Sequence, residues 1–366
     1  MAGFRVRAIT LHYGKPLHEA DAEDLAFRLL EAKDRVSSLF GVGVESVRIT
    51  FAPAGGGFRG ALEAAEDLEP GDLEGVFVNL GGYRLSGEED VEAVVDLVER
   101  GFFVSILYGG GGWSEARLAS EAFHKAASRS PDYPVHMGFN PLGDGLLTPY
   151  YPLSHAREGE TIVTVALLYP NHLREAFRRD GLEGVVEAMV EAGKLALSAG
   201  REAASLLGAE GYAVDLSISP WMEETVLGLV EEIAGVRLPD PGFAWGLYML
   251  NKAIERAASK LGPGRVTGFN EVQLPVAEDL KLKLRAAEGD TRARDLLRLA
   301  GVCLAGLDMV VLPASRDGVA GLLLEAEAYS RVKGRVVGVR VIPVEEVEPG
   351  DKVYLKRFGE VPVIPL

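Results

Sequence analysis

The sequence has little of several residue types, and each scarcity excludes something. Cys303 is the single cysteine among 366 residues, so no intramolecular disulfide and no zinc site built from cysteines can form. No run of about 18 apolar residues occurs, which excludes a membrane-spanning helix. The start also has no apolar stretch of signal-peptide length. We therefore expect a soluble, cytoplasmic protein.

Amides are scarce as well. One Gln and five Asn stand beside 27 Arg, a balance that fits a thermophile's chain or a GC-rich genome. The chain has 38 basic and 54 acidic residues and a formal net charge of −16. This charge argues against nucleic acid and against anionic membranes as partners. Hydrophobic residues make up 48% and charged residues 25%, the usual globular balance.

Apolar runs with strand character alternate with stretches of helical period along most of the chain. This alternation predicts an α/β protein with largely parallel strands. Ten strands are many for an open sheet, so we expect closure into a ten-stranded β/α barrel. We expect one barrel domain over 1–345, with halves of about 1–160 and 161–345, and a C-terminal hairpin over 346–366. The predicted strands are 4–11, 46–52, 74–80, 102–108, 134–139, 161–168, 212–218, 265–272, 308–312 and 335–342.

Several of these strands carry polar residues on alternate positions. In 212–219, Asp215, Ser217 and Ser219 share one face, and His136 and Asn140 share a face of another strand. In a barrel sheathed by helices, the polar face lines the interior. Such an interior implies space for water, a ligand or an internal hydrogen-bond network. The alternative is that these polar residues only satisfy one another.

Ligands of α/β proteins bind at the carboxyl ends of strands. Glycine-rich and polar residues gather at these ends, and the long loop 138–152 has no helical period. We therefore predict one cavity lined by both halves, with Asp215 and Glu271 as the catalytic acids. The predicted substrate-binding residues are His136, Asn140, Ser217, Ser219 and Asn270.

Other motifs give weaker signals. The glycines of 55–60 fit the pattern GxGxxG, but they follow the second strand, not the first. The glycines 109–112 offer backbone N–H groups to an anion or form a tight turn, and the turn is favoured.

Five further side chains are candidate metal ligands, reactive groups or structural anchors. A metal site from His136, Asp144 and His155 is conceivable within one loop, although isolated histidines are common. Cys303 is interpreted as a buried, inert thiol, and Asp308 as a structural anchor at the start of its strand.

Five segments carry a resemblance to one family. VCLAGLDMVVLP at 302–313 resembles the hallmark Cys-x-x-Gly-Leu-Asp-Met-(apolar)₃-Pro of domain of unknown function 711, also called uncharacterised protein family 0210. The segment 200–220 resembles that family's helix followed by Val-Asp-Leu-Ser. LPVAED at 274–279 is similar to its Ile-Pro-Val-Ser-Glu-Asp, and 336–344 and 5–11 fit in order.

The resemblance implies a fold similar to that of glycyl-radical enzymes, which is a ten-stranded α/β barrel of two five-stranded halves. It does not imply radical chemistry, because no C-terminal Arg-Val-x-Gly-(aromatic) segment is present. The family has no established reaction or cofactor. Its bacterial members tend to be encoded beside a small ACT-domain protein, so the resemblance implies such a partner and a link to amino-acid metabolism.

Three functions stay open from the sequence. The first is an enzyme, or a former enzyme, that acts on a small polar or anionic metabolite in the barrel. The second is a non-catalytic protein that senses a metabolite. The third is a structural subunit of a homo-oligomer, suggested by the broad apolar surface of the helix predicted over 182–207.

Overall fold

The computed structural model describes residues 3–68, 71 and 73–366, and the side chain of Cys303, with its predicted burial, lies outside this description. Nine strands form one sheet in the order β7-β6-β1-β2-β3-β4-β5-β9-β8. The strands are β1 (Arg5–Tyr13), β2 (Val44–Phe51), β3 (Val76–Tyr83), β4 (Phe103–Leu107), β5 (Met137–Asn140), β6 (Ile162–Leu168), β7 (Gly211–Asp215), β8 (Gly306–Pro313) and β9 (Gly338–Val344).

The direction of the strands divides the sheet into two parts. Strands β1 to β5 run parallel to one another, and β6 with β7 and β8 with β9 are parallel pairs. The two parts meet in antiparallel pairs, β1 with β6 and β5 with β9. The carboxyl ends of the first five strands therefore lie at the opposite rim from those of the later strands.

The predicted strand 265–272 is not a continuous strand, and the predicted closed barrel of ten strands is not present as one hydrogen-bonded sheet. Isolated parallel bridges join Val266 to Val214, and Val272 to both Ile218 and Leu304. The segment thus lies between β7 and the residues before β8. It loses regular pairing because Gly268 and Asn270 have positive φ, +87° and +50°, which is incompatible with an extended strand.

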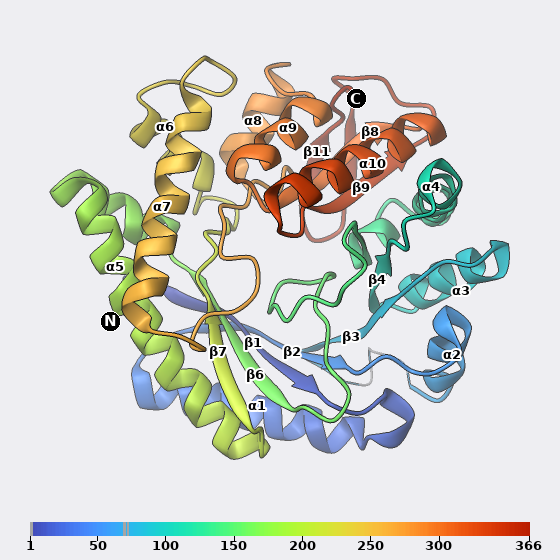
Figure 1. The fold of residues 1–366 in the computed structure, drawn as a ribbon, viewed down its shortest axis with the longest axis horizontal. Helices are drawn as coiled ribbons and strands as arrows, with labels where there is room; N and C mark the ends of the chain where they lie inside the picture. The colour runs from blue at the N-terminus through green and yellow to red at the C-terminus, as the bar shows by residue number, and fades with distance from the viewer. Residues whose placement is uncertain (1–2, 69–70, 72) are drawn as a thin grey trace.

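Helices cover the outer face of the strands (Figure 1). They bury their apolar stripes against the sheet, and α1 packs on α5 while α4 packs on α10. Among the described helices, none has both the length and the apolar character needed to cross a membrane. The helices are α1 (Ala22–Phe40), α2 (Gly57–Ala64), α3 (Glu88–Glu99), α4 (Gly112–Arg129), α5 (Pro170–Leu207), α6 (Val226–Ala234), α7 (Phe243–Leu261), α8 (Leu280–Ala287), α9 (Ala293–Cys303) and α10 (Arg316–Lys333).

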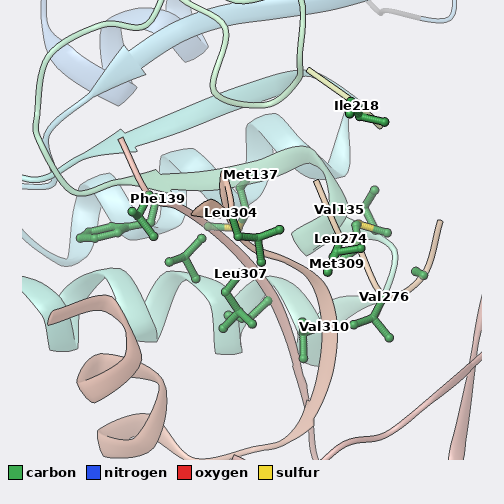
Figure 2. Close-up of a cluster of buried hydrophobic side chains, with 14 of the residues drawn as sticks. Val135, Met137, Phe139, Ile218, Leu274, Val276, Leu304, Leu307, Met309 and Val310 are labelled. Carbon is green, nitrogen blue, oxygen red and sulfur yellow. The ribbon is translucent and has the colours of Figure 1, made fainter. Parts of the chain in front are cut away.

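A cluster of buried apolar side chains joins the two parts of the sheet near the β5–β9 junction. Figure 2 shows side chains of β5, β8 and the segment 274–276 together in this cluster. Val135 and Leu274 belong to it and also border the cavity described below. The core therefore supports one wall of that cavity directly.

The C-terminal residues form the predicted hairpin, with strands β10 (Lys352–Leu355) and β11 (Gly359–Pro362). Its turn is tied to both parts of the chain. The backbone N–H of Lys356 donates to Asp132 (2.9 Å), and the Lys283 ammonium donates to the carbonyl of Phe358. The turn, with Arg357 and Phe358, is thereby held against the rim of the sheet.

Candidate functional site

The loop between β5 and β6 fills much of the space that the polar strand faces enclose. In Figure 1 this loop, drawn in green, runs through the middle of the molecule, on the side of the curved sheet opposite the helices. Asn79 and Ser105 both donate to the carbonyl of Pro152 (2.8 Å each), and Thr50 bonds Ser154 (2.7 Å). Many polar side chains on the inner faces of the strands therefore form hydrogen bonds to this loop. This agrees with the expected internal hydrogen-bond network.

His12 belongs to the same network. Its Nδ1–H donates to the carbonyl of His155 (2.9 Å), so Nε2 accepts from the Thr164 hydroxyl (2.7 Å). The side chain is 1% exposed, and burial lowers its pKa to about 4. His12 is thus a neutral structural link between β1, β6 and the loop.

A cavity of about 120 Å³ remains beside the loop, room for about four water molecules at roughly 30 Å³ each. Residues near the amino ends of β1 to β4 line it, together with residues that follow β7 and with the turn of the C-terminal hairpin. Four arginines and two acids supply its charge, an excess of two positive charges. The charged lining residues are Arg7, Arg48, Arg340, Arg357, Glu278 and Asp308.

A β-bulge brings Arg7 into this cavity. Val6 pairs with Leu167 and Ala8 pairs with Ala166, so one extra residue of β1 lies between consecutive partners on β6. Such a bulge turns a side chain to the other face of the sheet. Arg7 would otherwise share the outward face of Ile9.

Glu278 lies among the guanidinium groups. It pairs with Arg7 through one oxygen, and its other oxygen accepts from Arg340 (3.0 Å). Arg340 also binds Asp308 through two hydrogen bonds of 2.6 and 3.0 Å. Burial raises the pKa of Glu278, but the surrounding arginines outweigh it and hold that pKa below its ordinary value. Glu278 is therefore ionised at neutral pH.

Arg48 and Arg357 have no carboxylate partner among the described residues. Arg48 donates to the carbonyl of Pro149 (2.7 Å) and to Ser46 (3.2 Å). The guanidinium of Arg357 lies 4.8 Å from the ring centre of Phe77, a cation–π contact. Burial and the charges of Arg7 and Arg357 lower the pKa of Arg48 to about 10. Glu278 attracts both guanidinium groups, but neither forms an ion pair with a described acid.

His136 adds a hydrogen-bond acceptor to the cavity. Its Nδ1–H donates to the carbonyl of Val98 (3.3 Å), and no described residue bonds its Nε2. Burial, with the charges of Arg340 and Arg357, lowers the pKa of His136 to about 4. The imidazole is neutral at pH 7, with a lone pair on Nε2.

Of the seven predicted site residues, His136 and Ser219 line the cavity. Asp215, Ser217 and Asn270 lie together elsewhere, where they hold the segment after Val266. Asp215 accepts from the Ser217 hydroxyl (2.6 Å) and from the backbone N–H of Asn270 (3.1 Å). Asn270 in turn accepts from the N–H of Leu216 (2.9 Å).

Glu271 and Asn140 lie apart from the arginine-rich cavity. Glu271 is 2% exposed, pairs with Lys333 (2.7 Å) and Arg335 (3.2 Å), and borders a second cavity. Asn140 donates to the carbonyl of Asp144 (2.7 Å) at the carboxyl end of β5. Asn140 is far from the arginine-rich cavity because the carboxyl end of β5 lies at the rim opposite the amino ends of β1 to β4, which line that cavity.

The other motifs have structural roles. No three His, Cys, Asp or Glu side chains of the described residues are grouped as metal ligands, so the conceivable site of His136, Asp144 and His155 is not formed. In the glycine turn before α4, Gly109 and Gly111 donate to the carboxylate of Glu115, at 2.5 and 2.7 Å. The turn thus supplies its own anion.

Sequence reasoning missed the arginines and Glu278. Each of Arg7, Glu278 and Arg340 lies inside a segment that carries the family resemblance, at 5–11, 274–279 and 336–344. A charged residue within an apolar strand was the available signal, because such a residue needs a partner or a ligand.

Comparisons with known proteins agree with the resemblance. The family model "Uncharacterised ACR (DUF711)" matches residues 146–356. A UPF0210 protein of Pyrobaculum arsenaticum is 28% identical over 93% of this chain and 83% of its own length. One of Pyrobaculum aerophilum is 30% identical, but the match spans only 54% of that protein and 67% of this chain.

Among solved structures, the anaerobic ribonucleotide reductase of Thermotoga maritima, with citrate in the active site, matches with a TM-score of 0.41 and 12% identity. The match covers 92% of this chain and 79% of that one. The family model alone spans more than half of the present chain. The chain therefore belongs to the uncharacterised family DUF711, whose members are named UPF0210 proteins.

Proposed function

We propose that this protein binds a small anionic metabolite, through a carboxylate or phosphate group, in the arginine-rich cavity. The observation that carries the proposal is the pair Arg48 and Arg357, which face the cavity without a carboxylate partner. The cost of taking a guanidinium out of water applies to Arg48, which is half-buried, whereas Arg357 is exposed at the mouth of the cavity. A bound oxyanion offsets that cost and accepts the remaining N–H groups.

The charge of the whole chain strengthens this argument. A net charge of −16 repels anions at long range, yet the cavity lining carries two excess positive charges. A positive site within an acidic protein is selective for anions at short range. His136 and Ser219 contribute polar groups to the same lining, as proposed binding residues.

We further propose that the segment 265–272 completes a barrel. The bridges of Val266 and Val272 support an interpretation of the segment between them as the tenth strand of a barrel. The cavity lies at the rim of this barrel. The cavity suits an enzyme, a former enzyme or a metabolite sensor, and turnover of the bound anion distinguishes them. The homo-oligomer and the ACT-domain partner stay predictions.

Thermal unfolding in a series of acetate, benzoate, phosphate and phenyl phosphate tests the proposal. We expect at least one of these anions to stabilise the protein. Arg48→Gln and Arg357→Gln should each weaken binding by about 10- to 100-fold, the value of one charged hydrogen-bonding contact of roughly 1.5–3 kcal/mol.

Arg298→Gln is the matched control, because Arg298 is an exposed arginine that pairs with Asp295 outside the cavity. This variant should respond to anions as the unmodified protein does. Equal responses of all three variants would contradict the proposal, and so would the absence of any response to the four anions.

A further inference from the structure

The cavity has a charged level and an apolar level. Along β8 and β9 the pairs Asp308–Arg340 and Gly306–Gly338 are neighbours in register, and all four residues line the cavity. The two pairs are two residues apart, which separates them by about 6–7 Å along the strands.

The apolar level has a wall of its own. Tyr150, Leu153, Phe269 and Ala305 belong to a buried apolar cluster separate from the main core, and all four line the cavity. Gly338 allows close approach there, because a Cβ atom on it would lie 2.3 Å from Leu153.

We infer that the bound anion carries a compact apolar group, aryl or branched aliphatic, that extends from the arginines to the apolar level. This inference rests on the proposed function and adds the class of ligand. A carboxylate or phosphate at the charged level leaves its substituent directed at Phe269 and Ala305. A phenyl ring spans the distance between the levels, and a polar sugar would lose its hydrogen bonds to water there.

Titration calorimetry with matched pairs of anions tests this inference. Benzoate is compared with acetate, and phenyl phosphate with methyl phosphate, so that the head group and the apolar group vary separately. We expect the aryl member to bind at least tenfold more tightly in one pair or both, because the ring leaves water for an apolar wall. The pair with the tighter aryl member identifies the head group.

Two variants locate the effect. Ala305→Leu fills the apolar level and should abolish the aryl preference while the methyl anion keeps its affinity within about twofold. Phe269→Leu enlarges the same level and should favour naphthoate over benzoate, which keeps the test available if Ala305→Leu does not fold.

The outcomes separate the two proposals. Equal affinities within both pairs would overturn the apolar group and leave the anion site in place. An aryl preference that survives in Ala305→Leu, with no gain for naphthoate in Phe269→Leu, would also overturn it. No binding of any anion would contradict the proposed function itself.

Discussion

The replacement Asp215→Asn separates a structural role from a ligand-binding role of this buried acid. Oδ1 of Asp215 accepts from the N–H and hydroxyl of Ser217 and from the N–H of Asn270, at 2.9, 2.6 and 3.1 Å. Oδ2 accepts from the N–H of Phe269 (2.9 Å) and from the hydroxyl of Thr148 (3.0 Å). Five donors therefore occupy the carboxylate, and the side chain is fully buried.

Asparagine keeps one acceptor oxygen and places an NH₂ group where the other oxygen was. The Thr148 hydroxyl can rotate to accept from this group, but the N–H of Phe269 is left without a partner. One orphaned buried donor costs about 1–3 kcal/mol, and the loss of charge weakens the other bonds. We expect a loss of about 2–4 kcal/mol. At roughly 2.1 cal/mol/K per residue, this lowers Tm by about 3–5 °C.

Differential scanning calorimetry with and without a stabilising anion measures both effects. Asp215 does not line the arginine-rich cavity, so the stabilisation by anion should be unchanged in the variant. Ser219→Ala, in the cavity lining, is the matched comparison and should weaken the anion response with little change in Tm. An unchanged Tm together with a lost anion response in Asp215→Asn would refute this reasoning.

Three further predictions concern stability. The pKa of His12 is lowered to about 4 from 6.5, so the unfolded chain takes up the proton first as the pH falls. The free energy of unfolding should therefore fall by about 3 kcal/mol from pH 6.5 to 4. Urea titrations of His12→Gln should show a weaker dependence of this free energy on pH. Gly268→Ala should destabilise the protein by more than about 3 kcal/mol, because its Cβ would lie 2.1 Å from an Asp215 oxygen. Gly264 also has a positive φ, but no atom lies near its Cβ position. Gly264→Ala should therefore cost only about 1 kcal/mol. Asp279 accepts hydrogen bonds from backbone N–H groups of both α6 and α8. Chemical denaturation should therefore show that Asp279→Ala lowers the free energy of unfolding by about 2–4 kcal/mol. Asp21→Ala, which removes a single helix cap, should lower it by about 1 kcal/mol.

The sequence predicts the strands well where hydrophobic periodicity and backbone pairing coincide. Nine of the ten predicted strands overlap an observed one. The segment 265–272 fails because side chains, those of Asp215 and Asn270, replace the strand ladder. Periodicity reports which residues face inward, and it carries no information about a side chain that binds the backbone of a neighbouring segment.

The site is less predictable for a related reason. The bulge at Arg7 reverses the parity of β1, so a strict alternation assigns Arg7 to the outer face with Ile9 and Leu11. Arg357 reaches the cavity from a hairpin more than 300 residues away in sequence from Arg48. Only tertiary structure joins these groups, whereas His136 and Ser219 could be predicted from the polar faces of their strands.

The loop between β5 and β6 has a consequence for how the chain folds. It is bound from the early strands through Thr50 and Asn79, and from the later part through Asp215, which accepts from Thr148. The polar groups of the early strands therefore stay unsatisfied until the loop has entered, and the loop is fixed only when the later strands arrive. Folding should be a single cooperative event over these elements, dominated by contacts distant in sequence and correspondingly slow. A chain divided near residue 160 would leave each fragment with buried polar groups that only the other one satisfies.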